Sequence, residues 1–272
     1  MPTFTTPEPI AVRIDASAGW IRLVATDRTD TVVDLLPGDE SRGSDVWAAE
    51  HTRVDFRDGT LVVSGTKRGL ALFKGGVIDI EIELPARSRL HVSLGLATMR
   101  AEGEYGDVKI AAATGDVEVD VVKGRLKANN ASGSFTVHTV EGSASVGTAS
   151  GDVTIGDLHG DLKFNGVDGS LSVDRLSGDV KSRTVSGSVD VAVAVRGGVS
   201  AHTSSGEVAV GVAEGTAARL DIVTGSGVVS NDLQPSEGPQ QGDETFVLNV
   251  RSGSGDVSIR RANPALDAVS AT

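Results

Sequence analysis

One stretch of glycine-punctuated sequence decides the fold. Residues 149–182 read ASGDVTIGDLHGDLKFNGVDGSLSVDRLSGDVKS, with glycine every nine residues. Ten glycines share this register: Gly106, Gly115, Gly124, Gly133, Gly142, Gly151, Gly160, Gly169, Gly178 and Gly187. The register then shifts by one residue to Gly197 and continues at Gly206 and Gly215. Glycine makes up 34 of 272 residues, so ten at a fixed spacing indicate a structural repeat with turn glycines rather than a bias of composition.

The residues after each glycine alternate between apolar and polar. The second position is apolar in all ten copies, and the fourth is apolar in all but one, where Ser182 stands. The first and third positions are polar in every copy. A period of two is typical of half-buried β-strands. Each unit of nine residues is therefore predicted to be a strand of about five residues that ends in a turn.

The size of one coil follows from a second alternation. A single unit cannot bury its own apolar face, so the units are expected to stack. The residue two before glycine alternates between small, as in Ala113 and Ala131, and larger, as in Val122 and Val140. This favours an all-β, single-stranded β-solenoid (β-helix or β-roll) with about 18 residues and two strands per coil. The alternative is an antiparallel β-meander sandwich, because a nine-residue spacing also suits hairpins.

Four segments are expected along one continuous β-solenoid domain. Residues 1–100 lack the register but are β-rich, and they are predicted to form irregular coils and the cap that an open solenoid end needs. Residues 101–231 carry the regular repeat. Residues 232–260 are predicted to form a loop and closing strands, and residues 261–272 a tail.

Composition excludes several classes of protein. The formal net charge of −12 argues against a nucleic-acid binder, which needs a basic surface. The absence of cysteine excludes disulfides, thiolate metal sites and cysteine nucleophiles. No run approaches the length of apolar sequence that a membrane span needs, so no membrane insertion is predicted. The first residues show no signal-peptide pattern, and we therefore expect a cytoplasmic protein.

The repeat of two units also predicts two flat faces of unlike charge. Each face consists of the residues one and three after every second repeat glycine. The face that runs from Asp116 to Asp190 carries acids and hydroxyls and no base, whereas the other face carries five bases and three acids. We single out the acids of the first face as a candidate interaction face: Asp116, Glu118, Asp152 and Asp190. An acidic face steers towards a basic partner, so an as yet unidentified protein partner is the expectation.

No catalytic, cofactor or metal site is predicted. Asp116 and Glu118 have a spacing that a two-carboxylate glycosidase could use, but acids recur at this outward position along the repeat. The glycine of each unit is single, so the double-glycine cage of calcium-binding rolls is missing. The five histidines lack ligand spacing. These observations favour a protein that is not an enzyme.

Several segments resemble a bacterial family known as putative adhesins, which are β-strand-repeat proteins of unknown function. The segments that carry the resemblance are Thr6–Ile10, Thr26–Val33, Ile82–Ala86, Ala149–Val153 and Ser254–Val257. The resemblance implies a β-solenoid without established catalytic residues. The name adhesin implies an exported surface protein.

The leading functional hypothesis is a non-catalytic scaffold or protein-interaction module. The alternatives are an adhesin-like surface or glycan-binding protein and a glycan-active β-helix enzyme. Self-association through the solenoid ends is a further expectation, because unpaired strand edges are templates for another chain.

Overall fold

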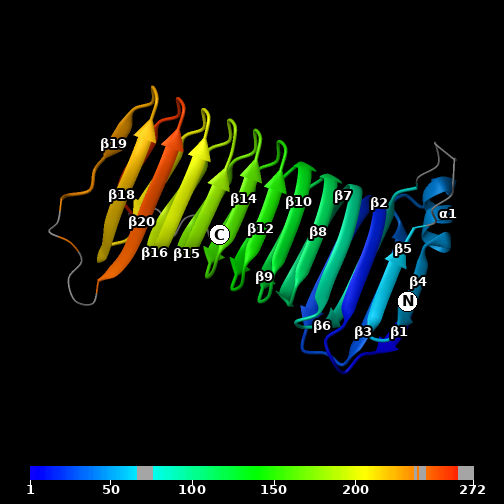
Figure 1. Ribbon diagram of the computed structural model, residues 1–272. Helices are drawn as coiled ribbons and strands as arrows, with labels where there is room; N and C mark the ends of the chain where they lie inside the picture. The colour runs from blue at the N-terminus through cyan, green and yellow to red at the C-terminus, as the bar shows by residue number, and fades with distance from the viewer. Residues whose placement is uncertain (66–75, 236–237, 239–242, 263–272) are drawn as a thin grey trace. The chain divides into compact units, whose positions relative to one another are not determined.

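The computed structural model describes residues 1–65, 76–235, 238 and 243–262 (Figure 1). Within them the chain is all-β except for one helix, α1 (Gly43–His51). No described helix is long and apolar enough to cross a membrane. The chain divides into two compact units, Met1–Val137 (unit 1) and His138–Thr272 (unit 2).

Unit 1 is built on parallel pairing between strands that are two repeats apart in the sequence. Its strands are β1 (Thr3–Thr5), β2 (Ala11–Thr26), β3 (Asp30–Pro37), β4 (Arg53–Arg57), β5 (Thr60–Ser64), β6 (Ile78–Pro85), β7 (Arg89–Tyr105), β8 (Val108–Thr114), β9 (Val117–Val122) and β10 (Leu126–Ser132); β11 (Phe135–Val140) runs into unit 2. Leu90 pairs with Val108, and Val108 pairs with Leu126. Paired positions are thus separated by two nine-residue repeats, and the strands run parallel.

The beginning of unit 1 departs from chain order. Strand β2 pairs with β7 along one edge. Along its other edge the first half of β2 pairs with β5 and the second half with β6. The antiparallel pairs β1–β3, β3–β6 and β4–β5 belong to the same region, and α1 contacts β3 and β6. Antiparallel strands and a helix interrupt the parallel stacking here, which is the way proteins commonly protect a sheet edge.

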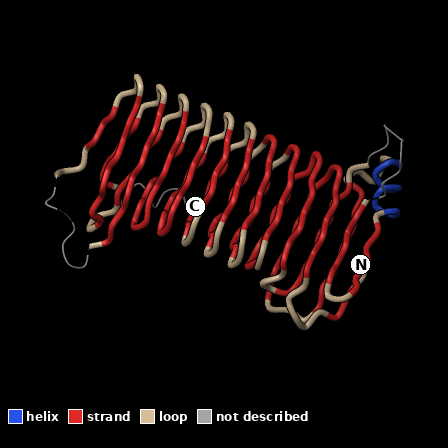
Figure 2. Tube along the Cα trace, viewed as in Figure 1, coloured by secondary structure: helices blue, strands red, loops and turns tan. Residues whose placement is uncertain are grey.

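Unit 2 repeats the same parallel pairing. Its strands are β12 (Ala144–Thr148), β13 (Val153–Leu158), β14 (Leu162–Gly166), β15 (Leu171–Arg183), β16 (Val189–Thr203), β17 (Val208–Val212), β18 (Thr216–Thr224), β19 (Val229–Asn231), β20 (Glu244–Ser252) and β21 (Val257–Arg261). Ala144 pairs with Leu162 and Leu162 with Val180, at the same separation of two repeats as in unit 1. Figure 2 shows the short turns between these strands in tan.

The shift in the glycine register appears in unit 2 as a β-bulge. Leu176 of β15 pairs with Ala194 of β16, but Ser177 pairs with Arg196, so Val195 is the extra residue. A bulge absorbs one residue in one strand without disturbing the alternation on either side. The next pair, Val189 with Val208, is consequently separated by two repeats and one additional residue.

The final strands of the chain are inner strands of unit 2. Strand β20 pairs with both β16 and β18, and β21 pairs with both β17 and β19. Residues 216–231 therefore form the outer strands, whereas chain order suggested that residues 232–260 would close the stack. A repeating pattern of burial specifies that strands stack, but it does not specify their order. Residues 236–237 and 239–242 of the expected loop, and residues 263–272 of the expected tail, lie outside the described residues.

The repeat positions form the core in both units. Residues two and four after each repeat glycine, from Val108 to Val191, are all at most 5% exposed. Ser182 occupies one of these positions at 1% exposure, and its hydroxyl has no hydrogen-bond partner among the described residues. The all-β prediction is thus confirmed, and the parallel pairing is consistent with a solenoid-like sheet rather than with an antiparallel meander.

The glycines are required by close backbone stacking as much as by turn geometry. A Cβ atom on Gly187 would lie 2.0 Å from the carbonyl oxygen of Gly169, and one on Gly169 would lie 2.2 Å from that of Gly151. The turn itself is held by the side chain three residues before glycine. Thr148 Oγ1 donates to the Gly151 carbonyl oxygen (2.9 Å) and accepts from the Gly151 amide (2.8 Å).

We expect Gly187→Ala to lower the free energy of unfolding by about 2–3 kcal/mol, because the new methyl group meets rigid backbone. Urea denaturation measures the change. Gly43→Ala is the matched control, since a Cβ there meets nothing within 4 Å. Equal stability of the two variants would contradict the stacking argument.

We expect Ser182→Ala to raise the free energy of unfolding by about 1 kcal/mol, because it removes a buried hydroxyl without a partner among the described residues. Thermal denaturation followed by circular dichroism measures this. Thr184→Ala is the contrast, since Thr184 Oγ1 donates to the Gly187 carbonyl oxygen (2.8 Å) and its loss should destabilise the turn. A lower free energy of unfolding for the Ser182→Ala protein would show that the hydroxyl stabilises the fold, against this prediction.

Candidate interaction faces

Two of the four predicted acids connect neighbouring strands. Asp116 Oδ1 accepts hydrogen bonds from the Ser134 amide (2.8 Å) and hydroxyl (2.6 Å). Asp152 Oδ1 accepts one from the Ser170 amide (3.0 Å). In both cases the donor is 18 residues further along the chain. Each exposed carboxylate therefore binds the backbone of the next strand pair, in addition to facing solvent.

The same contact recurs where aspartate follows glycine elsewhere. Asp107 Oδ1 accepts from the Arg125 amide (2.9 Å), and Asp256 Oδ1 accepts from the Val228 amide (2.8 Å). Hydrogen bonds from Ser134 hold the pKa of Asp116 below its usual value. The backbone amide of Arg125 does the same for the pKa of Asp107. At these four positions the aspartate after glycine thus makes a stacking contact, whereas the sequence alone indicates only an exposed acid.

Glu118 lies in a network of ion pairs in unit 1, at the end of the register row Glu81, Arg22, Arg100 and Glu118. It pairs with Arg100 (3.7 Å), which also approaches Glu102 (3.4 Å). Arg22 in turn pairs with Glu102 (3.2 Å) and with Glu81 (2.8 Å). The predicted face lacks bases only within the glycine register, because Arg22 and Arg100 belong to strands that precede it. In unit 1 this face therefore carries two arginines among its acids around Glu118.

Asp190 differs from the other three acids because it is half-buried. It lies on β16 between Ser172 of β15 and Ala209 of β17. Burial raises the pKa of Asp190; nearby Arg260 opposes this effect and Glu207 adds to it. The structure places Asp152 and Asp190 in unit 2, and Asp116 and Glu118 in unit 1.

The opposite charge collects on another surface of unit 1, which we call the cationic column. Arg13, His91, Lys109 and Lys127 pair in register on β2, β7, β8 and β10. All four are exposed, and no ion pair to any of them occurs among the described residues. Burial and the neighbouring Lys109 and Arg13 lower the pKa of His91. Adjacent strands lie about 4.8 Å apart, so the paired cations Lys109 and Lys127 repel one another.

The glycine register predicts two of the four residues of this column. Lys109 and Lys127 lie three residues after repeat glycines and are two of the five bases that the repeat predicts on the second face. Arg13 and His91 lie in residues 1–100, where the glycine register is absent and the alignment of strands could not be read.

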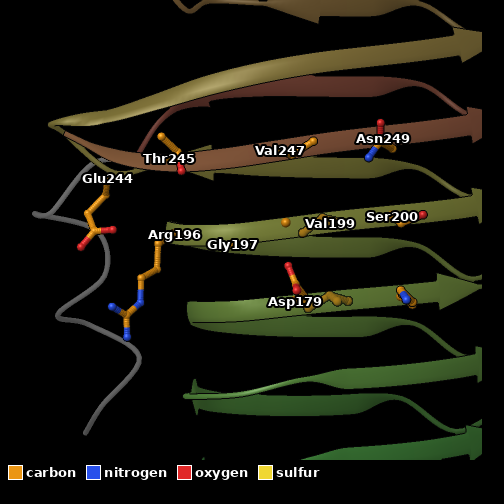
Figure 3. A pocket seen from close by; sticks show the side chains of 12 residues that line it. Asp179, Arg196, Gly197, Val199, Ser200, Glu244, Thr245, Val247 and Asn249 are labelled. Atoms are coloured by element: carbon orange, nitrogen blue, oxygen red, sulfur yellow. The ribbon is translucent and has the colours of Figure 1, made fainter. Parts of the chain in front are cut away.

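A shallow hollow of about 460 Å³ lies on the outer surface of unit 2 (Figure 3). It forms where Gly198 of β16, which has no side chain, pairs with Asp179 of β15 on one side and Val247 of β20 on the other. Arg196 and Glu244 also line it, so both signs of charge are present. The hollow reflects the missing side chain at Gly198, which leaves space between Asp179 and Val247 on the neighbouring strands.

The pattern of short parallel strands is that of a known family. The model of the family described as Toastrack DUF4097 matches residues 48–263. The chain belongs to this family. The predicted likeness to putative adhesins of unknown function is confirmed. A search of curated proteins finds no match.

Three solved structures illustrate what this Toastrack chain is similar to. A putative adhesin from Bacteroides fragilis is 12% identical, with a TM-score of 0.48 over 94% of this chain and 95% of that one. A putative lipid binding protein from Parabacteroides distasonis is 12% identical, with a TM-score of 0.47 and 96% of each chain covered. A putative adhesin from Parabacteroides merdae is 10% identical, with a TM-score of 0.40 over 96% and 95%. None of the three is named as an enzyme.

We expect Asp116→Ala to lower the free energy of unfolding by about 0.5–1 kcal/mol at neutral pH, because an exposed but charge-assisted contact is lost. Folding lowers the pKa of Asp116, so its contribution is present above the pKa of the unfolded chain. It disappears as the pH falls through the lowered pKa, and the two proteins should then become equally stable.

Urea denaturation at several pH values measures this difference. Asp161→Ala is the matched control, because Asp161 also follows a repeat glycine but its carboxylate has no hydrogen bond or ion pair among the described residues. An effect of Asp161→Ala as large as that of Asp116→Ala would refute the stacking role of the aspartate.

Proposed function

We propose that this protein is a non-catalytic β-solenoid, with two strands and about 18 residues per coil, that acts as a scaffold for a protein partner in the cytoplasm. The constant separation of two repeats between paired positions supports the coil size. The non-catalytic role is supported by the use of outward side chains in stacking contacts. Asp116 and Asp152 each bind the amide of a residue on the neighbouring strand pair.

The electrostatics of the carboxylates argue against the glycan-active alternative. A glycosidase needs one carboxyl with a raised pKa to serve as the acid. The pKa of Asp116 is instead lowered by its hydrogen bonds from Ser134. The raised pKa of Asp190 comes from burial on β16, in unit 2, whereas the carboxylate pair that sequence spacing suggested lies in unit 1.

The observation that carries the choice of partner is the cationic column. Its four side chains face solvent on paired strands without an ion pair among the described residues, so the approach of Lys109 to Lys127 costs electrostatic free energy. A bound acidic segment would offset that cost. The chain is acidic overall, so the attraction is local and should weaken with salt. We therefore propose an acidic protein segment as the ligand of unit 1.

The four acids provide the second candidate surface, for a basic partner. Asp152 and Asp190 support it, because serines adjoin both: Asp190 pairs with Ser172, and Asp152 accepts a hydrogen bond from the Ser170 amide. An adhesin-like role would use the same exposed faces at a cell surface. Cell fractionation distinguishes the two locations: the scaffold proposal expects the protein in the cytoplasmic fraction.

Fluorescence anisotropy with labelled peptides tests the choice of face. We expect a glutamate-rich peptide to bind at low salt, and the Lys109→Glu/Lys127→Glu protein to bind it at least about fivefold more weakly. Arg53→Glu/Arg57→Glu is the control, since both arginines are exposed and already pair with Asp55.

Two results would decide against the acidic partner. Binding that survives in the Lys109→Glu/Lys127→Glu protein would place the contact elsewhere. Preferential binding of a lysine-rich peptide, lost in the Asp152→Asn/Asp190→Asn protein, would assign the interaction to the acidic face.

A further inference from the structure

The outer edge of β18 is unpaired. On one side β18 pairs with β20 along its whole length, from Thr216 with Glu244 to Thr224 with Ser252. No strand among the described residues pairs with its other side. Strand β19 likewise pairs only with β21 within the described chain. A free edge of this length exposes a row of backbone donors and acceptors that another strand can bind.

The core of unit 2 is also incompletely covered at this edge. Leu220 and Ile222 of β18 point in the same direction as their partners Leu248 and Val250, yet they are only half-buried whereas those partners are 0% exposed. Val223 on the outer side is 54% exposed. An apolar and unpaired strand edge is an association site by its physical chemistry.

Two copies of β18 have complementary side chains when they are aligned antiparallel to each other. We propose that two copies of this chain form a two-fold symmetric dimer in which β18 pairs antiparallel with β18 of the other copy, centred on Leu220. Arg219 of each copy then faces Asp221 of the other. On the core side, Leu220 faces Leu220 and Ala218 faces Ile222. From residue 217 to residue 223 every pair joins opposite charges or apolar side chains, and at the two ends Thr216 faces Thr224. This is the pattern that stabilises neighbouring strands.

Other registers lose this complementarity. A shift by one residue puts core-facing side chains opposite outward ones. Moving the centre to residue 219 brings Arg219 opposite Arg219, and moving it to residue 221 brings Asp221 opposite Asp221. Like charges directly opposite one another are destabilising. The charges therefore select the register that is centred on Leu220.

Asp221 is already held in place for this contact. Its carboxylate oxygens accept hydrogen bonds from Arg251 of β20 (3.1 and 2.8 Å). Arg251 and Arg219 both lower the pKa of Asp221, Arg251 more strongly, so the carboxylate stays ionised at neutral pH. In the dimer, Asp221 would lie between Arg251 of its own chain and Arg219 of the other copy.

Sedimentation velocity of the full chain at several concentrations tests this inference. We expect a dimer that dissociates on dilution and with rising salt. Arg219→Asp and Asp221→Arg, each alone, should weaken the dimer at least about tenfold, because each places like charges opposite one another at both symmetric pairs. Mixing the two variant proteins should restore a dimer, since the two substituted side chains carry opposite charges and would face each other across the interface.

The controls separate dimerisation from misfolding. Lys163→Asp reverses a charge on the inner strand β14 and should leave the dimer intact. Recovery of the dimer on mixing excludes loss of folding as the cause of dissociation. A wild-type chain that stays monomeric at all concentrations, as it would if its own residues covered the edge, overturns the proposal. A dimer that neither charge reversal weakens also overturns it.

Discussion

The structure depends on the close approach of backbones at the glycine columns. Gly169 and Gly187 lie so near the carbonyl oxygens of the preceding strand pair that no Cβ atom fits between them. This contact sets the register in which strands two repeats apart pair, and that register in turn places Val153, Leu171 and Val189 in one buried row. Hydrophobic burial supplies the driving force, but the glycines determine which residues share a row.

Several outward side chains stabilise the stacking of strands. Asp116 and Asp152 each bind the amide of a residue two repeats further on, so acids that look available for a partner also hold the turns together. Charged side chains that make no such contact are therefore candidates for binding a partner. The cationic column of Arg13, His91, Lys109 and Lys127 is the clearest case in unit 1.

The sequence was informative where the repeat is strict. Its alternation correctly predicted which residues are buried, including Phe164, and the displaced Gly197 signalled the extra residue that forms the bulge at Val195. The position of β20 between β16 and β18 could not be predicted, because every strand of the stack carries the same pattern. Arg22 and Arg100 were missed as partners of the acidic face for a related reason: outside the glycine register, strand alignment has no marker in the sequence.

Disulfide cross-linking measures the strand register most directly, because the chain has no cysteine of its own. Lys163 and Lys181 are paired neighbours on β14 and β15, both exposed and two repeats apart in the sequence. Strand spacing is within the range that a disulfide spans. The Lys163→Cys/Lys181→Cys protein should therefore form an intramolecular disulfide on mild oxidation, and the Lys163→Cys/Ser172→Cys protein should not. Efficient cross-linking of positions 163 and 172 instead, which are one repeat apart, would contradict parallel stacking.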